Sequence, residues 1–237
     1  QAMILAAGYG IRMLPITQHI PKPLVEFNGQ PLIHNLIEKL QSNNINDITL
    51  NSHHLYEKIE FSIRKKFKED IKIIVEKKIL DTGGGIKNAM NYGYIKGNGN
   101  PIFILNGDIF WIEKNQTIFE RLSEKWESNE MDVLLTLKDK RDLFGYNGPG
   151  DYNLSGSDTD CEIILNKDKE KNYVYAGINL INCKLLKAIE EDKFSLKDVF
   201  DTAMQNKRLY GLIEKQDQWF HIGTVEDLKA AERFIKK

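Results

Sequence analysis

Four residues near the start of the chain have the types and the spacing needed to bind a polyphosphate. Gly8 and Gly10 follow a short apolar run, and glycine lets backbone N–H groups turn toward an anion without a Cβ in the way. Arg12 and Lys22 place two cations just beyond these glycines. The pattern is that of a buried strand that ends in a phosphate-binding loop.

Two better-known glycine loops do not fit this segment. Met13 stands where a dinucleotide-binding fingerprint requires its third glycine. A P-loop requires Gly-Lys-Ser/Thr, which the segment lacks. A generic dinucleotide-binding domain is therefore excluded.

The segment resembles the signature of the sugar-1-phosphate nucleotidylyltransferases, which make nucleotide sugars. The matching residues are Leu-Ala-Ala-Gly-x-Gly-x-Arg-Met-x-Pro-x-Thr at positions 5–17 and Pro-Lys-Pro at positions 21–23. The resemblance runs from Leu5 to the final helix and is strongest to short enzymes of the N-acetylmuramate 1-phosphate uridylyltransferase type. It implies that the nucleotide is bound by Leu5, Ala6, Ala7, Gly8 and Gly10.

A second candidate group follows the apolar run at residues 101–105. Asn106-Gly107-Asp108 comes at the end of this expected strand, where open α/β sheets bind their ligands. A carboxylate there is suited to a magnesium ion bound to phosphates, although Asp after Gly is also ordinary turn sequence. The resemblance implies that Asp108 is the metal aspartate, with Mg²⁺ as the cofactor and Mn²⁺ as a possible substitute.

Leu80-Asp81-Thr82 leads into three consecutive glycines, Gly83 to Gly85. Glycine is costly inside an element, so we expect a loop that a base or ribose approaches closely, the alternative being a flexible loop. In the resembled family the corresponding loop closes over the nucleotide, which implicates Thr82 and Gly83. Glu76 stands where relatives read the base. Its carboxylate could accept the ring N–H of uracil, thymine or guanine without separating the three.

The remaining candidates come from the resemblance and from one departure from it. Relatives carry a metal-binding aspartate in Trp-x-Asp-Ile/Val-Gly-Thr, where this chain has His221. The imidazole could bind a metal directly, and manganese accepts an imidazole ligand more readily than magnesium does. The alternatives are that His221 contacts phosphate, that it acts through water, or that it is structural. On the sugar side, the resemblance implicates Gly177 and Asn179, and Gly177 could equally be a packing glycine.

The elements that must position these residues alternate between strands and helices, which indicates a parallel, helix-covered sheet. The expected strands are residues 3–7, 47–51, 71–75, 101–105, 133–137, 173–181 and 208–213. The expected helices are residues 31–42, 56–67, 86–92, 117–126 and 185–189, with two more that begin at Ser195 and Val225. Residues 144–157 should be irregular or a hairpin that forms one wall of the acceptor pocket. Together with the resemblance, this predicts an α/β, Rossmann-like, three-layer nucleotidyltransferase fold with a mostly parallel mixed central sheet. We expect one domain over residues 1–237, with sugar-side insertions around 140–180.

Composition excludes several classes of protein. Lys and Arg number 33 against 34 Asp and Glu, so the net charge of −1 suggests no nucleic-acid or anionic-membrane partner. Cys161 and Cys183 form no Cys-x-x-Cys pair, which argues against a disulfide framework or zinc knuckle. No apolar run is long enough for a signal peptide or membrane span. We expect a cytoplasmic monomer or small homo-oligomer whose partners are small molecules.

These parts predict one reaction, in which a sugar 1-phosphate attacks the α-phosphorus of a nucleoside triphosphate and pyrophosphate leaves. No nucleophile of the Ser/His/Asp or Cys/His kind presents itself, so positioning and charge neutralisation by Arg12, Lys22 and Asp108 must supply the rate. UTP and N-acetylmuramate 1-phosphate are the favoured pair, as in peptidoglycan recycling. The alternatives are guanylyl transfer to mannose or heptose 1-phosphate and a non-catalytic nucleotide-sugar sensor. Acetyl transfer is not expected, because the repeat domain of the bifunctional relatives is missing.

Overall fold

A computed structural model describes residues 1–154, 160–164 and 171–236. The strands are β1 (Ala2–Leu5), β2 (Glu26–Phe27), β3 (Gln30–Pro31), β4 (Ile48–Ser52), β5 (Ile71–Val75), β6 (Ile102–Asn106), β7 (Phe110–Ile112), β8 (Val133–Asp139), β9 (Cys161–Ile163), β10 (Tyr173–Ile181), β11 (Leu209–Ile213) and β12 (Gln218–Phe220). The α-helices are α1 (Leu32–Ser42), α2 (Tyr56–Phe67), α3 (Asp81–Asn91), α4 (Ile118–Lys125), α5 (Lys184–Lys187), α6 (Leu196–Gln205) and α7 (Val225–Ile235). Three short 3-10 helices cover Ile11–Met13, Ile16–Gln18 and Lys22–Leu24.

One eight-stranded sheet runs through the molecule in the order β5-β4-β1-β6-β10-β8-β11-β9. The strands from β5 to β6 are parallel, as is the β8–β11 pair, whereas β10 is antiparallel to both β6 and β8. The predicted α/β fold with a mostly parallel mixed sheet is therefore confirmed. Because β1, β4 and β6 are parallel neighbours, the segments that follow them meet at one edge of the sheet.

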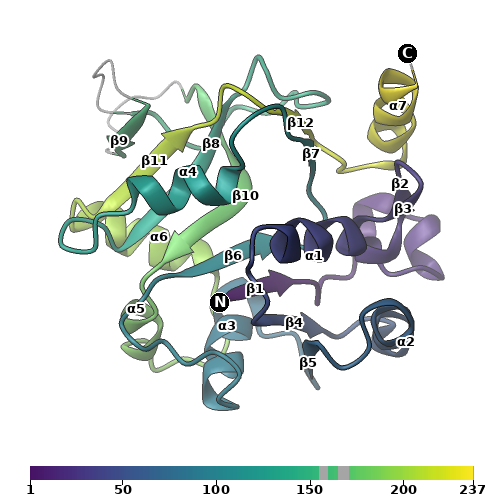
Figure 1. The fold of residues 1–237 in the computed structure, drawn as a ribbon, viewed down its shortest axis with the longest axis horizontal. Coiled ribbons are helices and arrows are strands. Elements are labelled where there is room, and N and C mark those ends of the chain that lie inside the picture. The colour runs from purple at the N-terminus through teal and green to yellow at the C-terminus, as the bar shows by residue number, and fades with distance from the viewer. Residues whose placement is uncertain (155–159, 165–170, 237) are drawn as a thin grey trace.

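Helices cover both faces of the sheet (Figure 1). Alternation along each strand decides which face a side chain reaches. Ile4 packs in the cluster that includes α1, α2 and α4, whereas Met3 packs in the cluster that includes α3, α5 and α6. Phe103 and Ile104 of β6 divide between the faces in the same way. Each layer therefore has its own core, with the sheet between them.

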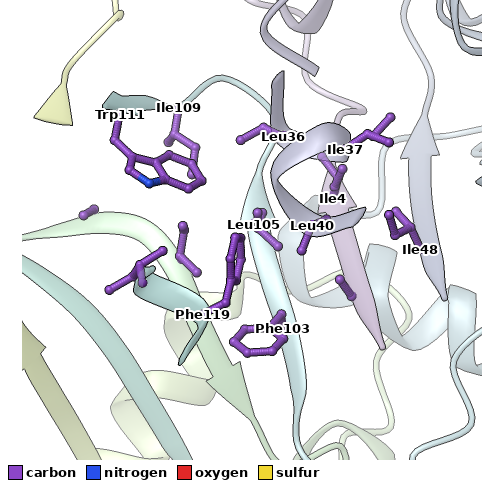
Figure 2. Close-up of a cluster of buried hydrophobic side chains, with 14 of the residues drawn as sticks. Ile4, Leu36, Ile37, Leu40, Ile48, Phe103, Leu105, Ile109, Trp111 and Phe119 are labelled. Carbon is purple, nitrogen blue, oxygen red and sulfur yellow. The ribbon is translucent and has the colours of Figure 1, made fainter. Parts of the chain in front are cut away.

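The packing of α1 shows how one apolar helix face is used. Leu36, Ile37 and Leu40 are fully buried, and Figure 2 shows them beside Ile4 of β1 and Ile48 of β4. Full burial of such a side chain contributes roughly 1.5–3 kcal/mol. This packing fixes the helix that follows the phosphate loop against the strand that precedes it.

Two short sheets and α7 form a third cluster beside the main sheet. β7 pairs with β12, and β2 pairs with β3. The buried side chains of this cluster include Met13 of the first 3-10 helix, Phe110 of β7, Phe220 of β12 and Leu228 of α7. The glycine-rich loop is thus anchored through Met13 to the C-terminal part of the chain.

Residues 144–157 were expected to be irregular or a hairpin. Tyr152 makes an isolated bridge with Tyr173, and Leu154 makes one with Ile164. Residues 155–157 of this prediction lie outside the described residues. No helix within the described ranges has the length and apolar character to cross a membrane.

Candidate active site

A cavity of about 520 Å³ opens where β1, β4 and β6 end. Ten of the site residues predicted from the sequence line this cavity. They are Leu5, Ala6, Ala7, Gly8, Gly10, Arg12, Lys22, Glu76, Thr82 and Asp108. These residues come from segments far apart in the chain. The topology of the parallel strands brings them together at one edge of the sheet.

The glycine-rich loop has two glycines with different roles. Gly8 lines the cavity, and a Cβ there would have no heavy atom within 4 Å. Gly10 has φ of 65°, and its Cβ would lie 2.9 Å from Thr17 Cγ2 and 3.0 Å from Lys22 Cβ. The Thr17 hydroxyl and the Met13 N–H both donate to the Gly10 carbonyl, each at 2.9 Å. Gly8 therefore leaves room for a ligand, whereas Gly10 permits a tight, fixed turn.

Two cations and one carboxylate lie along the cavity. Lys22 Nζ donates to Asp108 Oδ2 at 2.6 Å, with the Lys22 side chain 9% exposed and that of Asp108 36% exposed. Arg12 is exposed and has no hydrogen-bond or ion-pair partner in the part of the chain that the structure describes. The free guanidinium of Arg12 and the ammonium of Lys22, which Asp108 holds in place, are suited to bind an anion that enters from solvent.

Asn51, at the end of β4, is a cavity residue that the sequence reasoning did not identify. Its Oδ1 accepts the Ala6 N–H at 2.8 Å, and its Nδ2 donates to Glu76 Oε1 at 2.7 Å. The Leu80 N–H donates to Glu76 Oε2 at 3.1 Å. Asn51 is 2% exposed and Glu76 is 3% exposed. The position of Asn51 at the end of a parallel strand next to β1 was the signal that could have revealed it.

A second cavity of about 270 Å³ adjoins the first, and Thr82 and Asn106 line both. Its wall also includes Asp151, Lys171 and Tyr175. Asp151 Oδ2 accepts the Tyr175 N–H at 2.9 Å, and its Oδ1 has no partner among the described residues. The irregular segment after residue 144 therefore contributes to this wall, and its role in an acceptor pocket stays a prediction.

The two lysines of the second cavity differ in their charge environment. Lys197 Nζ lies 2.6 Å from Asp201 Oδ2. The Lys171 ammonium has no ion-pair or hydrogen-bond partner among residues 1–154, 160–164 and 171–236. Among the residues that the structure describes, Lys171 is therefore the cation of this cavity that is available to an acidic group.

The sequence profile of the nucleotidyl transferase family matches residues 1–237. This chain belongs to the nucleotidyl transferase family. An N-acetylmuramate alpha-1-phosphate uridylyltransferase from Caulobacter vibrioides is 29% identical over 238 residues, which cover 98% of this chain and 95% of that protein. A mannose-1-phosphate guanyltransferase from Debaryomyces hansenii is also 29% identical, over 96% of this chain but only 62% of its own length.

Solved structures agree with this nucleotidyl transferase fold. HddC from Yersinia pseudotuberculosis, complexed with GMP-PN, aligns with a TM-score of 0.74 and 24% identity over 99% of this chain and 98% of that one. The likeness shows the fold. The resemblance of the glycine-rich signature to this family is confirmed, and the chain is a nucleotidyltransferase.

His221 of this nucleotidyl transferase lies beside the first cavity and does not line it. Burial lowers the pKa of His221, Asp227 opposes this shift, and the charges of Arg12 and Lys22 add to it. Its ring meets that of Tyr146 edge-on, with the centroids 5.7 Å apart. The imidazole is therefore held neutral, the form that can ligate a metal or accept a hydrogen bond.

The donor set fits a divalent ion through one carboxylate. Asp108 Oδ2 is held by Lys22, while Oδ1 has no partner among the described residues. The described part of the chain holds no group of three or more His, Cys, Asp and Glu side chains that could hold a metal. Magnesium is commonly bound by one or two carboxylates together with substrate phosphates and water, and this set allows that arrangement.

The three consecutive glycines are not a loop, which corrects the prediction. Gly83, Gly84 and Gly85 lie inside α3, and a Cβ on Gly83 would be 2.3 Å from the Phe194 ring. On Gly84 it would be 2.2 Å from the Asp192 carbonyl oxygen. The expected close approach exists, but it is made by the protein's own chain. Tertiary packing outweighs the cost of glycine in a helix, which is roughly 0.5–1 kcal/mol per residue.

The same contact accounts for the first turn of α3. The N–H groups of Gly83 and Gly84 both donate to the Phe194 carbonyl at 3.1 Å, and the Thr82 hydroxyl accepts the Leu196 N–H at 2.7 Å. These N–H groups are among those that a helix leaves without an internal partner. Gly83 lines neither cavity, whereas Thr82 lines both.

Gly177 and Asn179 also lie behind the cavity walls. Gly177 has φ of 87°, and its Cβ would be 2.6 Å from Ile109 Cγ2 and 3.2 Å from Asn106 Nδ2. Asn179 is fully buried, and its Oδ1 accepts the Tyr175 hydroxyl at 2.6 Å. Their role toward sugar stays a prediction. Each of them contacts a residue that lines a cavity: Gly177 packs against Asn106, and Asn179 is hydrogen-bonded to Tyr175.

Proposed function

We propose that this nucleotidyl transferase transfers a nucleotidyl group from a nucleoside triphosphate to a sugar 1-phosphate and releases pyrophosphate. The observation that carries the proposal is the pair of adjoining cavities. One contains the glycine-rich loop with Arg12 and Lys22, the other contains mixed polar and charged groups, and Thr82 and Asn106 belong to both. A phosphate at this junction can meet an α-phosphorus bound in the first cavity.

The reaction needs positioning more than proton transfer. The attacking oxygen belongs to a phosphate and is already a nucleophile, so no general base is required. Arg12 meets the β- and γ-phosphates, and Lys22 meets the α-phosphate or the attacking phosphate. Arg12 and Lys22 offset the repulsion between the two negatively charged phosphates and the negative charge that gathers on the leaving pyrophosphate.

We propose Mg²⁺ as the cofactor, with Mn²⁺ as a substitute, held by Asp108 and by phosphate oxygens. A divalent ion supplies charge neutralisation and a template that orients the phosphates. Lys22 fixes the orientation of the Asp108 carboxylate through the 2.6 Å contact. Neutral His221 would ligate the ion or accept a hydrogen bond from a water molecule bound to it.

We favour UTP and N-acetylmuramate 1-phosphate as substrates, which would place the protein in peptidoglycan recycling. Glu76 supports a base with a ring N–H, and uracil has one. Lys171 supports an acceptor that carries an acidic group, and the lactyl ether of muramate ends in a carboxylate. The Caulobacter relative is named for this pair of substrates.

The second candidate is guanylyl transfer to mannose or heptose 1-phosphate. Guanine also presents a ring N–H to Glu76, and the Debaryomyces relative is a mannose-1-phosphate guanyltransferase with the same identity. Neither of these acceptors has a carboxylate for Lys171. This difference favours the muramate acceptor.

Pyrophosphate release tests the proposal. UTP, GTP, dTTP, CTP and ATP are each combined with the 1-phosphates of N-acetylmuramic acid, N-acetylglucosamine, mannose, glucose and heptose, first with magnesium and then with manganese. We expect the highest rate with UTP and N-acetylmuramate 1-phosphate. A maximum with GTP and mannose or heptose 1-phosphate would support the second candidate. Nucleotide binding with no pyrophosphate from any pair would reject catalysis and leave a nucleotide-sugar sensor.

A further inference from the structure

Asn51 links two other parts of the first cavity, the glycine-rich segment and Glu76, through its side-chain amide. Its Oδ1 accepts the N–H of Ala6 in the glycine-rich segment, at 2.8 Å. Because a backbone N–H can only donate, the amide oxygen must face Ala6, and the amide nitrogen must face the other way. That nitrogen lies 2.7 Å from Glu76 Oε1.

This orientation of the Asn51 amide determines the hydrogen-bonding role of the Glu76 carboxylate. Oε1 receives the Asn51 amide N–H, and Oε2 receives the Leu80 N–H at 3.1 Å. Both oxygens must therefore act as acceptors. Each keeps one further lone pair, and the residue lines the first cavity while only 3% exposed. A buried carboxylate with both oxygens bound has little freedom to turn.

Helix α3 packs directly on the two side chains. A Cβ on Gly85 would lie 2.6 Å from Asn51 Nδ2 and 2.8 Å from Glu76 Oε1. The third glycine of the run is thus required by the Asn51–Glu76 contact. The backbone of α3 at Gly85 therefore packs against the Asn51–Glu76 contact and limits the movement of both groups.

We propose that Asn51 is a positioning residue that sets which nucleobases the site accepts, by holding Glu76 as a fixed acceptor at the cavity wall. The inference rests on the proposed function to the extent that the first cavity binds the nucleoside triphosphate. A fixed acceptor favours a base whose ring nitrogen carries hydrogen, as in uracil and guanine. It repels a ring nitrogen with a lone pair, as in cytosine and adenine.

UTP and CTP provide the matched ligands, because they differ only at N3 and at the group on C4. We expect the wild-type protein to bind UTP about tenfold or more tightly than CTP. The measurement is the Kd of each nucleotide by calorimetry, with magnesium and without acceptor sugar. It therefore gives a result even if the sugar or the reaction is wrong.

Two single variants remove the positioning contact. Asn51→Leu removes both hydrogen bonds and keeps the branched shape and the number of heavy atoms of the side chain. Asn51→Asp keeps an acceptor for Ala6 but sets a carboxylate against Glu76. In both variants the UTP/CTP preference should fall toward one, with lower thermal stability.

The double variant Asn51→Asp/Glu76→Gln separates positioning from stability. The introduced aspartate would accept from Ala6 and from the side-chain amide of the introduced glutamine. The glutamine oxygen would accept from Leu80, so every contact returns with unchanged net charge. We expect the melting temperature to recover and a UTP/CTP discrimination of about tenfold to return. It should favour UTP if the base meets the glutamine oxygen and CTP if it meets the glutamine amide nitrogen.

Three results would overturn the inference. They are equal wild-type affinity for UTP and CTP, single variants that keep the wild-type preference, and a stable double variant that binds both nucleotides equally. A wild-type protein that binds neither nucleotide would instead reject the proposed function. The two failures are therefore distinguishable.

Discussion

Lys22 Nζ lies 2.6 Å from Asp108 Oδ2 and joins two segments that are 86 residues apart in the chain. Lys22 comes from the third 3-10 helix and Asp108 from the turn after β6. The two residues were predicted separately, one as a phosphate cation and the other as a metal ligand. Their contact means that the orientation of each depends on the other.

The contact predicts that Lys22 and Asp108 act as one unit in catalysis. Lys22→Met and Asp108→Asn should each lower kcat on the order of a hundredfold or more, because the first removes a cation that faces the phosphates and the second removes the carboxylate proposed to hold the metal. If the two effects were independent, they would multiply, and the double variant would be far less active than either single variant. We expect strong non-additivity instead, since residues that act together lose most of their effect with the first substitution.

Steady-state pyrophosphate release on the three variants and the wild type measures this coupling. Circular dichroism melting serves as the folding control. Effects that multiply across the double variant would show that the Lys22–Asp108 contact has no role in turnover.

The charge environment of the second cavity predicts a change in acceptor preference. Lys171→Met should lower kcat/KM for N-acetylmuramate 1-phosphate about tenfold or more, because a charged hydrogen bond to the carboxylate is lost. N-acetylglucosamine 1-phosphate has no such carboxylate, so its kcat/KM should be unchanged. The matched control is Lys197→Met, because Lys197 is already paired with Asp201 and its side chain is 70% exposed. Equal losses for both sugars in Lys171→Met would contradict a role in reading the acidic group.

Much of the fold and of the first cavity was predictable, because both depend on local patterns. Apolar runs that end in Gly8 and in Asn106-Gly107-Asp108 indicate strands whose ends carry ligand-binding groups. Parallel pairing then places those ends together. The position of the signature from Leu5 to Lys22 in the cavity can therefore be predicted from local sequence and from parallel strand pairing alone.

The features that were missed depend on contacts between distant segments. Asn51 looks like an ordinary strand residue until Ala6 and Glu76 lie on either side of it. The glycine run looks like a loop until Phe194 and the segment before it pack on α3. The antiparallel placement of β10 between β6 and β8 is likewise a matter of topology that strand patterns do not encode.

The packing of α3 predicts that Gly84→Ala destabilises the fold, against the usual trend. An alanine in the interior of a helix is normally more stable than glycine by roughly 0.5–1 kcal/mol. Here the added Cβ would be 2.2 Å from the Asp192 carbonyl oxygen, which is backbone and cannot move alone. We expect a net loss of about 1–3 kcal/mol in the free energy of unfolding, measured in urea. Asn91→Ala, at an exposed position in the same helix, is the control and should change stability by less than about 0.5 kcal/mol. A stabilised Gly84→Ala protein would be inconsistent with this contact.

The environment of His34 predicts how stability changes with pH. Burial lowers the pKa of His34 below 6.5, Lys66 lowers it further, and Glu38 opposes the shift. The imidazole shares a 2.9 Å hydrogen bond with Ser62 and meets the Phe67 ring edge-on. In the folded protein the neutral form is therefore favoured.

The sign of the effect follows from proton uptake. As pH falls below 6.5, the unfolded chain binds a proton at this histidine more readily than the folded chain does, so the folded state loses stability. Stability should be constant with respect to this group above that pH and should decline from about pH 6.5 toward pH 5. His34→Gln should remove part of the decline, and the lowered pKa of His221 should account for a further part. Urea unfolding at intervals from pH 7.5 to 5 measures the slope, with His19→Gln as an exposed-histidine control. If His34→Gln loses stability as steeply as the wild type over this range, the buried neutral imidazole is not a source of the acid sensitivity.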